Sequence, residues 1–581
     1  MLLPLRASLA AAGLRRRLHR ASVALALAAG ALAVDASAAD VAPGPVVELP
    51  KFEVTDSRLL PPPESWRYAQ IPGFEILSRI SERETKRFVR DFMLLQEVIN
   101  MIMPVLLRGS TPVPTALILC GSRGKGFEEF LPQDQEIERY GKNSLFFKNT
   151  ERAAIVIDFA LTELQVENDV RLEADPYRAF YAAYFRFLIR RQLADKAPPW
   201  FEEGLVQLFA ATEFDKKTIT FAQIGDGFGA EKIGDFNRML SQRAMMPFGQ
   251  MLATNGPKNR NAFWSAQCYA FIHFCLYGTG NKYQRPFMQF VQRLADEEPT
   301  EKLFKECFGK TYNQFATELR GYLGFTTYKA QQYRAKKGES LPEPPAVALR
   351  EASDADVGRI KGEVLRLGGY GDAARNTLIA PYVRGERDPR LLAALGLDEK
   401  LAGHDDRARK FLEAASNAKV DRARAYLELA RLRLDDVRPK DGAARKQLNS
   451  DQVTHVLTPL FTARSTPPPM ADVYSLIAET WSLSEAPPLA EHLAVVIEGV
   501  RRFPRDTGLL MQATLLAAKR GFPAEAAALA KFGVKISTDA GLKDRFETLA
   551  AAYERDETKP ADGKPEPAPA ASQPYLLNKA P

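Results

Sequence analysis

The chain has 581 residues, of which 46% are hydrophobic and 26% charged, so its composition is that of a globular protein and excludes wholesale disorder. Its length predicts more than one domain. The formal net charge is +7, but residues 1–38 carry five arginines and one acid, Asp35, and account for more than half of it. The weakly basic remainder gives no reason to expect a nucleic-acid partner.

The first 38 residues have the features of a secretory signal peptide. Arginines precede the apolar run VALALAAGALAV, which ends near a small-x-small sequence at Ala36-Ser37-Ala38. This run is too short to span a bilayer, which needs about 20 residues; an uncleaved anchor is the alternative. No other stretch is long and apolar enough to cross a membrane. We therefore expect cleavage near Ala38 and a periplasmic or secreted protein without a transmembrane span.

Residues 39–72 are rich in proline and predict an extended tether or an edge strand. Beyond them, short apolar runs predict strands and a longer amphipathic run predicts a helix. The predicted strands are FEILS, TALILC, NSLFF and AAIVIDF, and the predicted helix is ERETKRFVRDFMLLQEVINMIM. A small sheet therefore opens a domain over residues 73–330.

Two helices separated by a proline pair follow this sheet. Asp175 and Pro176 predict a helix start, and the helix should continue to about Ala194. Pro198 and Pro199 then break the chain, and a second helix begins near Pro199 with WFEEGLVQLFAA. Further helices are predicted over NAFWSAQCYAFIHFCLYG and TYNQFATELRGYL.

The C-terminal part changes in composition. Residues 331–348 form a charged, proline-rich linker, and residues 349–555 are rich in Ala, Leu and Arg with helical periodicity. A weak 34-residue period, in which Leu395-Gly396 recurs as Leu429-Ala430, predicts tetratricopeptide-like repeats. The small and apolar positions of the second helix are Ala408, Leu412 and Ala415. An irregular helical bundle is the alternative, and residues 556–581 should form a disordered tail.

The run PPWFEEGL, the preceding FLIRR and the later FGKTYNQF with ELRGYL give residues 70–325 a resemblance to secreted gluzincin-like, peptidase-MA-like proteins. Such zinc peptidases place two histidines four residues apart on one helix and a glutamate on the next. The resemblance implies an α+β fold class, in which a thermolysin/gluzincin-like domain with a small sheet lobe plus helices precedes an all-α tetratricopeptide-like repeat domain.

The same resemblance shows what the chain lacks. Aligning FLIRR with the FLLRR of such relatives places Ala182 and Ala183 at the first histidine and the catalytic glutamate, and Arg186 at the second histidine. Alanine has no ligand atom and arginine has no lone pair, so only Glu203 keeps its role as the third ligand. We therefore expect no catalytic residue, no cofactor and no zinc, which describes a pseudo-metallopeptidase.

Other potential metal ligands do not complete a site. His273 is the only histidine near this domain, and with Glu203 it falls short of three ligands; a buried packing residue is the simpler interpretation. The four cysteines lack C-x-x-C spacing. Cys268 and Cys275 lie about 10.5 Å apart along one predicted helix, too far to pair. The pairing of Cys120 and Cys307 stays open.

A carboxylate without a cation is costly in a cleft. We therefore predict that the Arg186 guanidinium pairs with Glu203 in place of the metal; an arginine that reaches solvent is the alternative. Glu202 should be solvated, because adjacent helical residues do not share a face. The residues of the possible cleft are Trp200, Glu202, Glu203 and Arg186.

The run CGSRGKG does not fit a phosphate-binding loop, because that motif needs Gly in place of Leu119 and Ser or Thr in place of Gly126. It does not fit a nucleophile elbow either, because that motif needs Gly in place of Cys120. It predicts a turn. The sequence thus favours an exported, non-catalytic protein that binds peptide or protein through a remnant cleft and helical repeats. The alternatives are an active hydrolase with a non-standard site and a structural envelope protein.

Overall fold

The computed structural model describes residues 47–52, 60–102, 113–121, 126–131, 144–159, 164–165, 171–172, 176–193, 197–215, 217–223, 239–240, 244–253, 261–294, 297–324, 330–336, 339–341, 343–438, 447–487, 489–537 and 539–557. The expected signal peptide and all but the first two residues of the expected tail lie outside this set. All described helices and strands belong to one compact unit, Leu49–Pro581.

A six-stranded sheet forms the centre of the N-terminal part, with the strand order β11-β1-β2-β3-β5-β4. The strands β2, β3 and β5 run parallel, whereas β1, β4 and β11 pair antiparallel with their neighbours. The bounds are β1 Arg67–Ile71, β2 Phe74–Ser78, β3 Thr115–Cys120, β4 Ser144–Lys148, β5 Ala153–Asp158 and β11 Arg350–Glu351. The four strands predicted from apolar runs are confirmed within one residue at each end.

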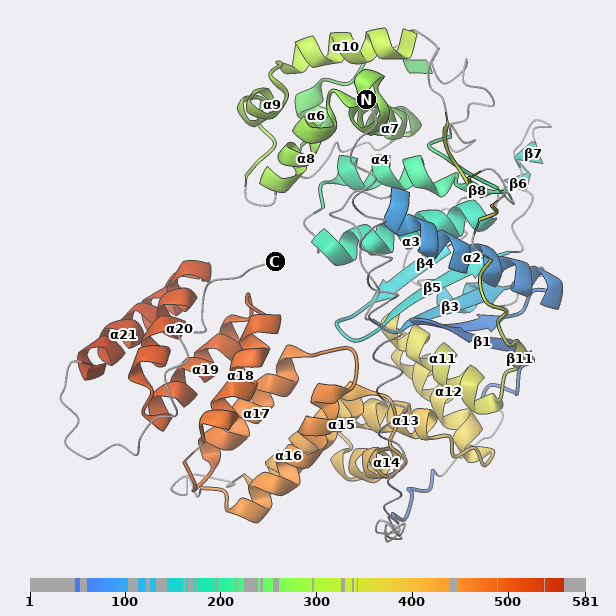
Figure 1. Ribbon diagram of the computed structural model, residues 1–581. Coiled ribbons are helices and arrows are strands. Elements are labelled where there is room, and N and C mark those ends of the chain that lie inside the picture. Colours follow the sequence, from blue (N-terminus) through green and yellow to red (C-terminus); the bar gives the residue numbers. More distant parts are fainter. Residues whose placement is uncertain are drawn as a thin grey trace, which may run out of the picture. The chain divides into compact units, whose positions relative to one another are not determined.

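The central strands β2, β3 and β5 are buried at nearly every position because both faces of the sheet are covered. Ile76, Leu117 and Ile155 belong to the core that contains the helices α2 (Glu82–Ile102) and α3 (Pro176–Leu193). Their sequence neighbours point the other way and pack with α11 (Asp354–Leu367). Figure 1 shows α2 and α3 on one side of the sheet and α11 on the other.

Two segments expected to be extended connections take part in sheets. β1 comes from the segment 39–72, and it pairs with β2 on one side and β11 on the other, so it is not an edge strand. The segment 331–348 begins with β10 (Gln331–Arg334), which pairs antiparallel with β9 (Thr218–Phe221). Apolar or exposed runs of four or five residues carry too little periodicity to reveal such pairings.

The two helices of the motif region are confirmed, α3 as given above and α4 as Pro199–Ala210. Pro198 is the N-cap of α4 and Pro199 its first residue, where a missing N–H costs nothing. α4 packs closely on α7 (Ala262–Tyr277) at Gly204, where an added Cβ would lie 2.7 Å from the Cys268 carbonyl oxygen.

The remaining elements of this part are short. They are η3 Glu128–Phe130, β6 Leu164–Gln165, β7 Arg171–Leu172, β8 Glu213–Phe214, α6 Phe248–Met251, η6 Thr279–Asn281, α8 Gln284–Arg293, α9 Glu301–Phe308 and α10 Tyr312–Gly324. The helices α6 to α10 enclose an aromatic core in which Phe271, Phe304 and Phe315 contact one another.

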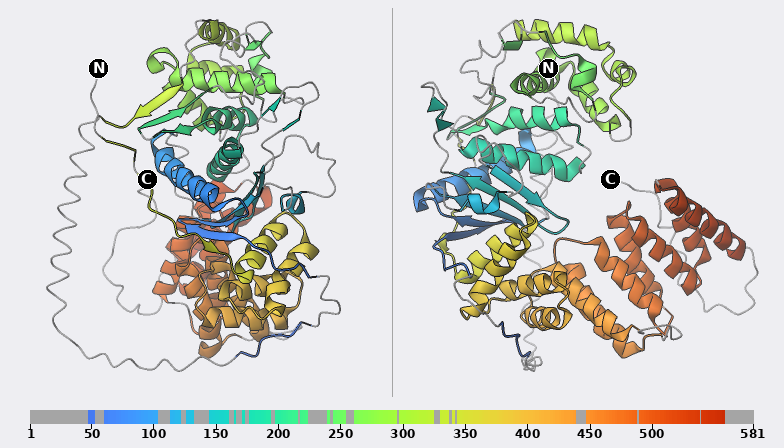
Figure 2. Two further views of the ribbon diagram at one scale, coloured as in Figure 1. Left: turned by 90° about the vertical axis from the view of Figure 1, so that its right-hand side faces the viewer. Right: turned by 180° about the vertical axis from the view of Figure 1, so that it is seen from behind.

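The C-terminal part is an all-helical repeat array of stacked antiparallel helices (Figure 2). After α11 it contains α12 Gly371–Val383, α13 Pro389–Leu401, α14 Asp405–Asn417, α15 Ala423–Val437, α16 Ser450–Ser465, α17 Ala471–Leu483, α18 Ala490–Arg502, α19 Thr507–Arg520, α20 Pro523–Ile536 and α21 Ala540–Glu557.

The 34-residue period has a structural basis in one repeated contact. An added Cβ at Gly362 would lie 2.7 Å from Leu378 Cγ, and an added Cβ at Gly396 would lie 2.7 Å from Leu412 Cγ. The glycine and the leucine each recur 34 positions later, so in both helix pairs the leucine of one helix packs directly on the glycine of the other. Between α15 and α17 the spacing lengthens to 48 residues, so the regular period covers only the first part of the array. No described helix is long and apolar enough to cross a membrane.

Candidate functional site

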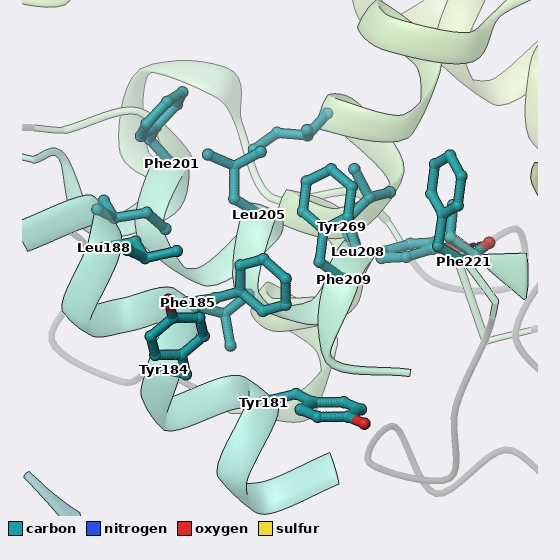
Figure 3. Close-up of a cluster of buried hydrophobic side chains, with 14 of the residues drawn as sticks. Tyr181, Tyr184, Phe185, Leu188, Phe201, Leu205, Leu208, Phe209, Phe221 and Tyr269 are labelled. Atoms are coloured by element: carbon teal, nitrogen blue, oxygen red, sulfur yellow. Dashed lines mark hydrogen bonds between the residues drawn. The ribbon is translucent and has the colours of Figure 1, made fainter. Parts of the chain in front are cut away.

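The motif positions lie on two helices that an aromatic cluster holds together. Tyr184 and Phe185 of α3 are almost fully buried, and Phe185 packs against Phe209 of α4 with ring centroids 5.4 Å apart (Figure 3). Ala183 belongs to the same core and is only 5% exposed, whereas Ala182 lies partly at the surface. The face of α3 that carries residues 182 and 186 is therefore the one that can present side chains to α4.

The predicted pair of Arg186 and Glu203 is present. Arg186 Nη2 lies 3.4 Å from Glu203 Oε2, and Gln207 Nε2 donates to Glu203 Oε1 at 2.9 Å. The Glu203 side chain is only 16% exposed, so both of its oxygens are held by these two neighbours. A cation and a neutral donor thus occupy the surroundings of the carboxylate that aligns with a zinc ligand.

The prediction that Glu202 is solvated is wrong. Arg190 donates two hydrogen bonds to its carboxylate, at 2.8 and 2.7 Å, and Arg186 Nε lies 3.7 Å away. Arg190 follows Arg186 by one helical turn, so both arginines face α4, and the motif comparison did not consider the second one. The result is a neutral four-charge cluster of two arginines and two glutamates.

Trp200 is a core residue rather than a cleft residue. Its side chain has no exposed surface and packs edge-on against Phe271 and Phe287, with Phe290 alongside. Its indole Nε1 has no hydrogen-bond acceptor among the described residues. Of the four residues expected at a cleft, Arg186, Glu202 and Glu203 reach the surface, whereas Trp200 lies in the aromatic core.

No group of three or more His, Cys, Asp or Glu side chains in the described part of the chain is arranged to hold a metal ion. His273 is 1% exposed and shares a 2.9 Å hydrogen bond through Nδ1 with the Tyr322 hydroxyl, so it is a buried packing residue. All four cysteines are free; Cys120, Cys268 and Cys275 are buried. Burial raises the pKa of the Cys275 thiol well above its usual value, which disfavours the reactive thiolate.

The outer edge of the sheet is formed by β4, which packs on α3. Among the described residues β4 pairs only with β5, and its Phe146 ring lies 5.5 Å from Phe187 of α3. Asn149 donates its N–H to the Arg152 carbonyl at the hairpin turn, and hydrogen-bonded pairs alternate along an antiparallel ladder. The N–H group of Phe146, three residues before Asn149, therefore points away from β5, toward the outer edge.

No family model matches the chain, and no curated protein matches it. Solved structures with some likeness include a thermophilic TPR protein of Thermus thermophilus, which shares 16% identity with a TM-score of 0.25 and aligns over 33% of this chain and 97% of its own. The TPR domain of P58(IPK) shares 11% identity with a TM-score of 0.21, over 58% of this chain and 82% of its own.

Proposed function

We propose that the chain is an exported, non-catalytic relative of the gluzincin peptidases, whose tetratricopeptide-like array and peptidase-like domain bind a peptide or protein. The observation that supports the proposal is the Arg186–Glu203 pair, whose two residues correspond to zinc-ligand positions if the resemblance to gluzincins holds. A carboxylate neutralised by a guanidinium is a poor metal ligand, and neither alanine at 182 and 183 can replace the missing imidazole or base.

Binding of an extended chain is supported by the outer edge of β4. An added strand gains affinity from main-chain hydrogen bonds, and the outward N–H group of Phe146 would donate one of them. The aromatic contact between Phe146 and Phe187 holds this edge against α3. The helical array adds a second extended surface of the type that repeat proteins use for partners.

Phe146 offers a matched pair of variants for the binding test. Peptides would be selected on the wild-type protein from a phage library of random dodecapeptides and measured by fluorescence polarisation. Phe146→Ala and Phe146→Pro both lose the aromatic ring, but only the proline also removes the outward N–H donor. The proline variant should therefore bind the selected peptides about fivefold or more weakly than the alanine variant, the value of roughly one hydrogen bond. Equal binding by the two variants would exclude strand addition at β4.

Catalysis is tested with the purified protein, a varied peptide mixture and added zinc. We expect no cleavage and far less than one zinc per chain by elemental analysis. Chelator-sensitive cleavage that disappears in Glu203→Gln would instead establish an active hydrolase. Export is tested separately by fractionating cells that express the full chain; a protein that stays in the cytoplasm with residues 1–38 attached would remove that part of the proposal.

A further inference from the structure

A buried ionic cluster joins the sheet to the helical array. It consists of three glutamates and four arginines whose charged groups lie within 4 Å of a partner: Glu75, Glu151, Glu363, Arg152, Arg359, Arg390 and Arg422. Arg359, Glu363 and Arg422 are at most 4% exposed. Such groups are retained in an interior only when they are paired, so the cluster is a constructed feature of the fold.

Three of the arginines form ion pairs with Glu75 of β2. Arg359 of α11 donates to both of its carboxylate oxygens, at 2.6 and 2.9 Å. Arg390 Nη1 lies 3.3 Å from Glu75 and Arg152 Nη1 lies 3.9 Å away. Burial alone would raise the pKa of Glu75, but these guanidinium groups outweigh it and lower that pKa to about 2.

Arg422, the N-cap residue of α15, connects the other two glutamates. Its Nε donates to Glu151 at 2.8 Å, and its Nη1 contacts Glu363 of α11. Arg152 Nη1 also contacts Glu363, at 2.6 Å. Burial would raise the pKa of Glu363, but Arg152 and Arg422 lower it to about 2, so this carboxylate stays ionised.

The cluster has one positive charge more than its carboxylates neutralise. Among these seven residues, four arginines share three glutamates. The pKa of Arg152 is lowered by burial and by the neighbouring Arg422, as expected where positive charge is not fully balanced.

This excess charge borders an open space. A cavity of about 300 Å³ lies where β2 and β3 begin, and its lining includes Gln70, Thr115, three arginines (Arg152, Arg390 and Arg422) and two acids (Glu75 and Asp421). Within the described residues, Arg422 Nη2 and Arg152 Nε are buried without a hydrogen-bond partner. Each unsatisfied donor of a buried cation carries a cost of about 1–3 kcal/mol or more.

We propose that this cavity binds a small oxyanion, a molecule with a carboxylate or phosphate group that accepts hydrogen bonds from Arg422 and Arg152. An oxyanion supplies the acceptors that the two guanidinium groups lack and the negative charge that the cluster lacks; water would supply only the acceptors. Guanidinium groups bind both kinds of anion through paired N–H donors. The volume lies at the lower end of ligand pockets, which fits a small molecule.

Arg390 binds the same ligand from the mouth of the cavity. Its side chain is 44% exposed, and its ion pair with Glu75 is shared with two other arginines. Removal of Arg390 therefore takes a cation from the cavity without leaving Glu75 unpaired. Arg422 is less suited to a test, because its loss leaves Glu151 and Glu363 facing each other with one cation fewer and should unfold the protein.

The test is calorimetric titration of the mature protein with succinate and with inorganic phosphate in a low-salt buffer. We expect one site per chain for at least one of them. Binding of succinate alone assigns a carboxylate ligand, and binding of phosphate alone assigns a phosphate ligand. Arg390→Gln should weaken the binding about tenfold or more, the loss of one charge-assisted hydrogen bond.

The matched control is Arg438→Gln. Arg438, at the C-terminal end of α15, is 46% exposed, similar to Arg390, but it pairs with Glu479 and not with the cluster. The variant should bind the anion as wild type does. The proposal is overturned if neither anion saturates a site on the wild-type protein, or if Arg438→Gln weakens binding as much as Arg390→Gln.

Discussion

The side chain of Arg186 supplies the positive charge next to Glu203, the role that our proposal gives it in place of a metal ion. Its guanidinium brings a positive charge to Glu203, but it is 35% exposed and the contact is 3.4 Å long, so the pair contributes at most about 1 kcal/mol to stability. Its role is geometric, because it holds one oxygen of the Glu203 carboxylate beside α3.

That geometry can be tested by returning imidazoles to α3. Ala182→His with Arg186→His places two histidines four residues apart, facing Glu203, and should create a three-ligand zinc site with an affinity that the wild type lacks. Ala183 is left unchanged because it is buried. Zinc binding would be measured by competition with a fluorescent chelator.

The control for the rebuilt site is Glu203→Gln in the same double variant, which should lose most of the added zinc affinity. If the double variant folds and binds no zinc, the helices do not have the peptidase-like arrangement that the resemblance implies, and the proposal of a pseudo-metallopeptidase loses its support.

Gly204 decides how closely α4 and α7 approach. A Cβ at this position would lie 2.7 Å from both the Cys268 carbonyl oxygen and Ile272 Cδ1, so Gly204→Ala should lower the free energy of unfolding by about 1–3 kcal/mol. Gly321, in α10, has nothing within 4 Å of the same position, and Gly321→Ala should be neutral or raise stability by up to about 1 kcal/mol. Urea denaturation of both variants tests this; equal effects would contradict the close approach.

At the scale of elements, α11 belongs to two structures at once. It begins the helical array and also closes the second face of the sheet, where Ile360 and Val364 pack with Leu77, Ile118 and Val156. β11, just before it, pairs with β1. A division of the chain at residue 348 therefore separates a sheet from half of its own core.

Truncation measures this dependence. A chain that ends after Ala348 loses β11, α11 and two of the three arginines that pair with Glu75, Arg359 and Arg390, so it should show no cooperative thermal unfolding by circular dichroism. A chain that ends after Arg438 keeps α11 and Arg422 and should retain a cooperative transition. A cooperative transition of the shorter chain at the temperature of the full protein would show that the sheet does not need α11.

The sequence predicted the elements well where the signal was local. Proline pairs and N-caps located α3 and α4, and apolar runs located β2, β3 and β5. It allowed only an edge strand in the segment that contains β1 and did not reveal β11, because the pairing of β1 with β11 joins residues hundreds of positions apart. It also missed the ionic cluster, since Arg359 and Glu363 occur in an amphipathic pattern in which charges are normally solvated. Their burial depends on a sheet that the helix sequence does not encode.

For the whole molecule, the ionic cluster connects parts of the chain that are far apart in sequence. Glu75 comes from the sheet, Arg359 and Glu363 from α11, and Arg422 from the start of α15. Breaking such a buried set costs more than losing a surface pair, because the remaining charges stay in the interior. The stability of the unit Leu49–Pro581 should therefore depend on the ionisation of these glutamates.

This dependence gives a defined pH range. The pKa values of Glu75 and Glu363 are lowered from 4.5 to about 2 in the folded protein, so their contribution is complete above about pH 4.5 and is lost as the pH falls toward 2. The free energy of unfolding should fall over that range.

Glu75→Gln should be less stable than wild type by about 3 kcal/mol at neutral pH, and this difference in the free energy of unfolding should narrow between pH 4.5 and 2 because only the wild type loses a charge there. Glu82→Gln, whose carboxylate is 59% exposed and paired with Lys86, serves as the control and should change stability far less. The free energies of unfolding would be measured from denaturation curves at pH 7, 4.5 and 2.5. If wild type and Glu75→Gln differ by the same free energy at all three pH values, the cluster does not hold Glu75 ionised.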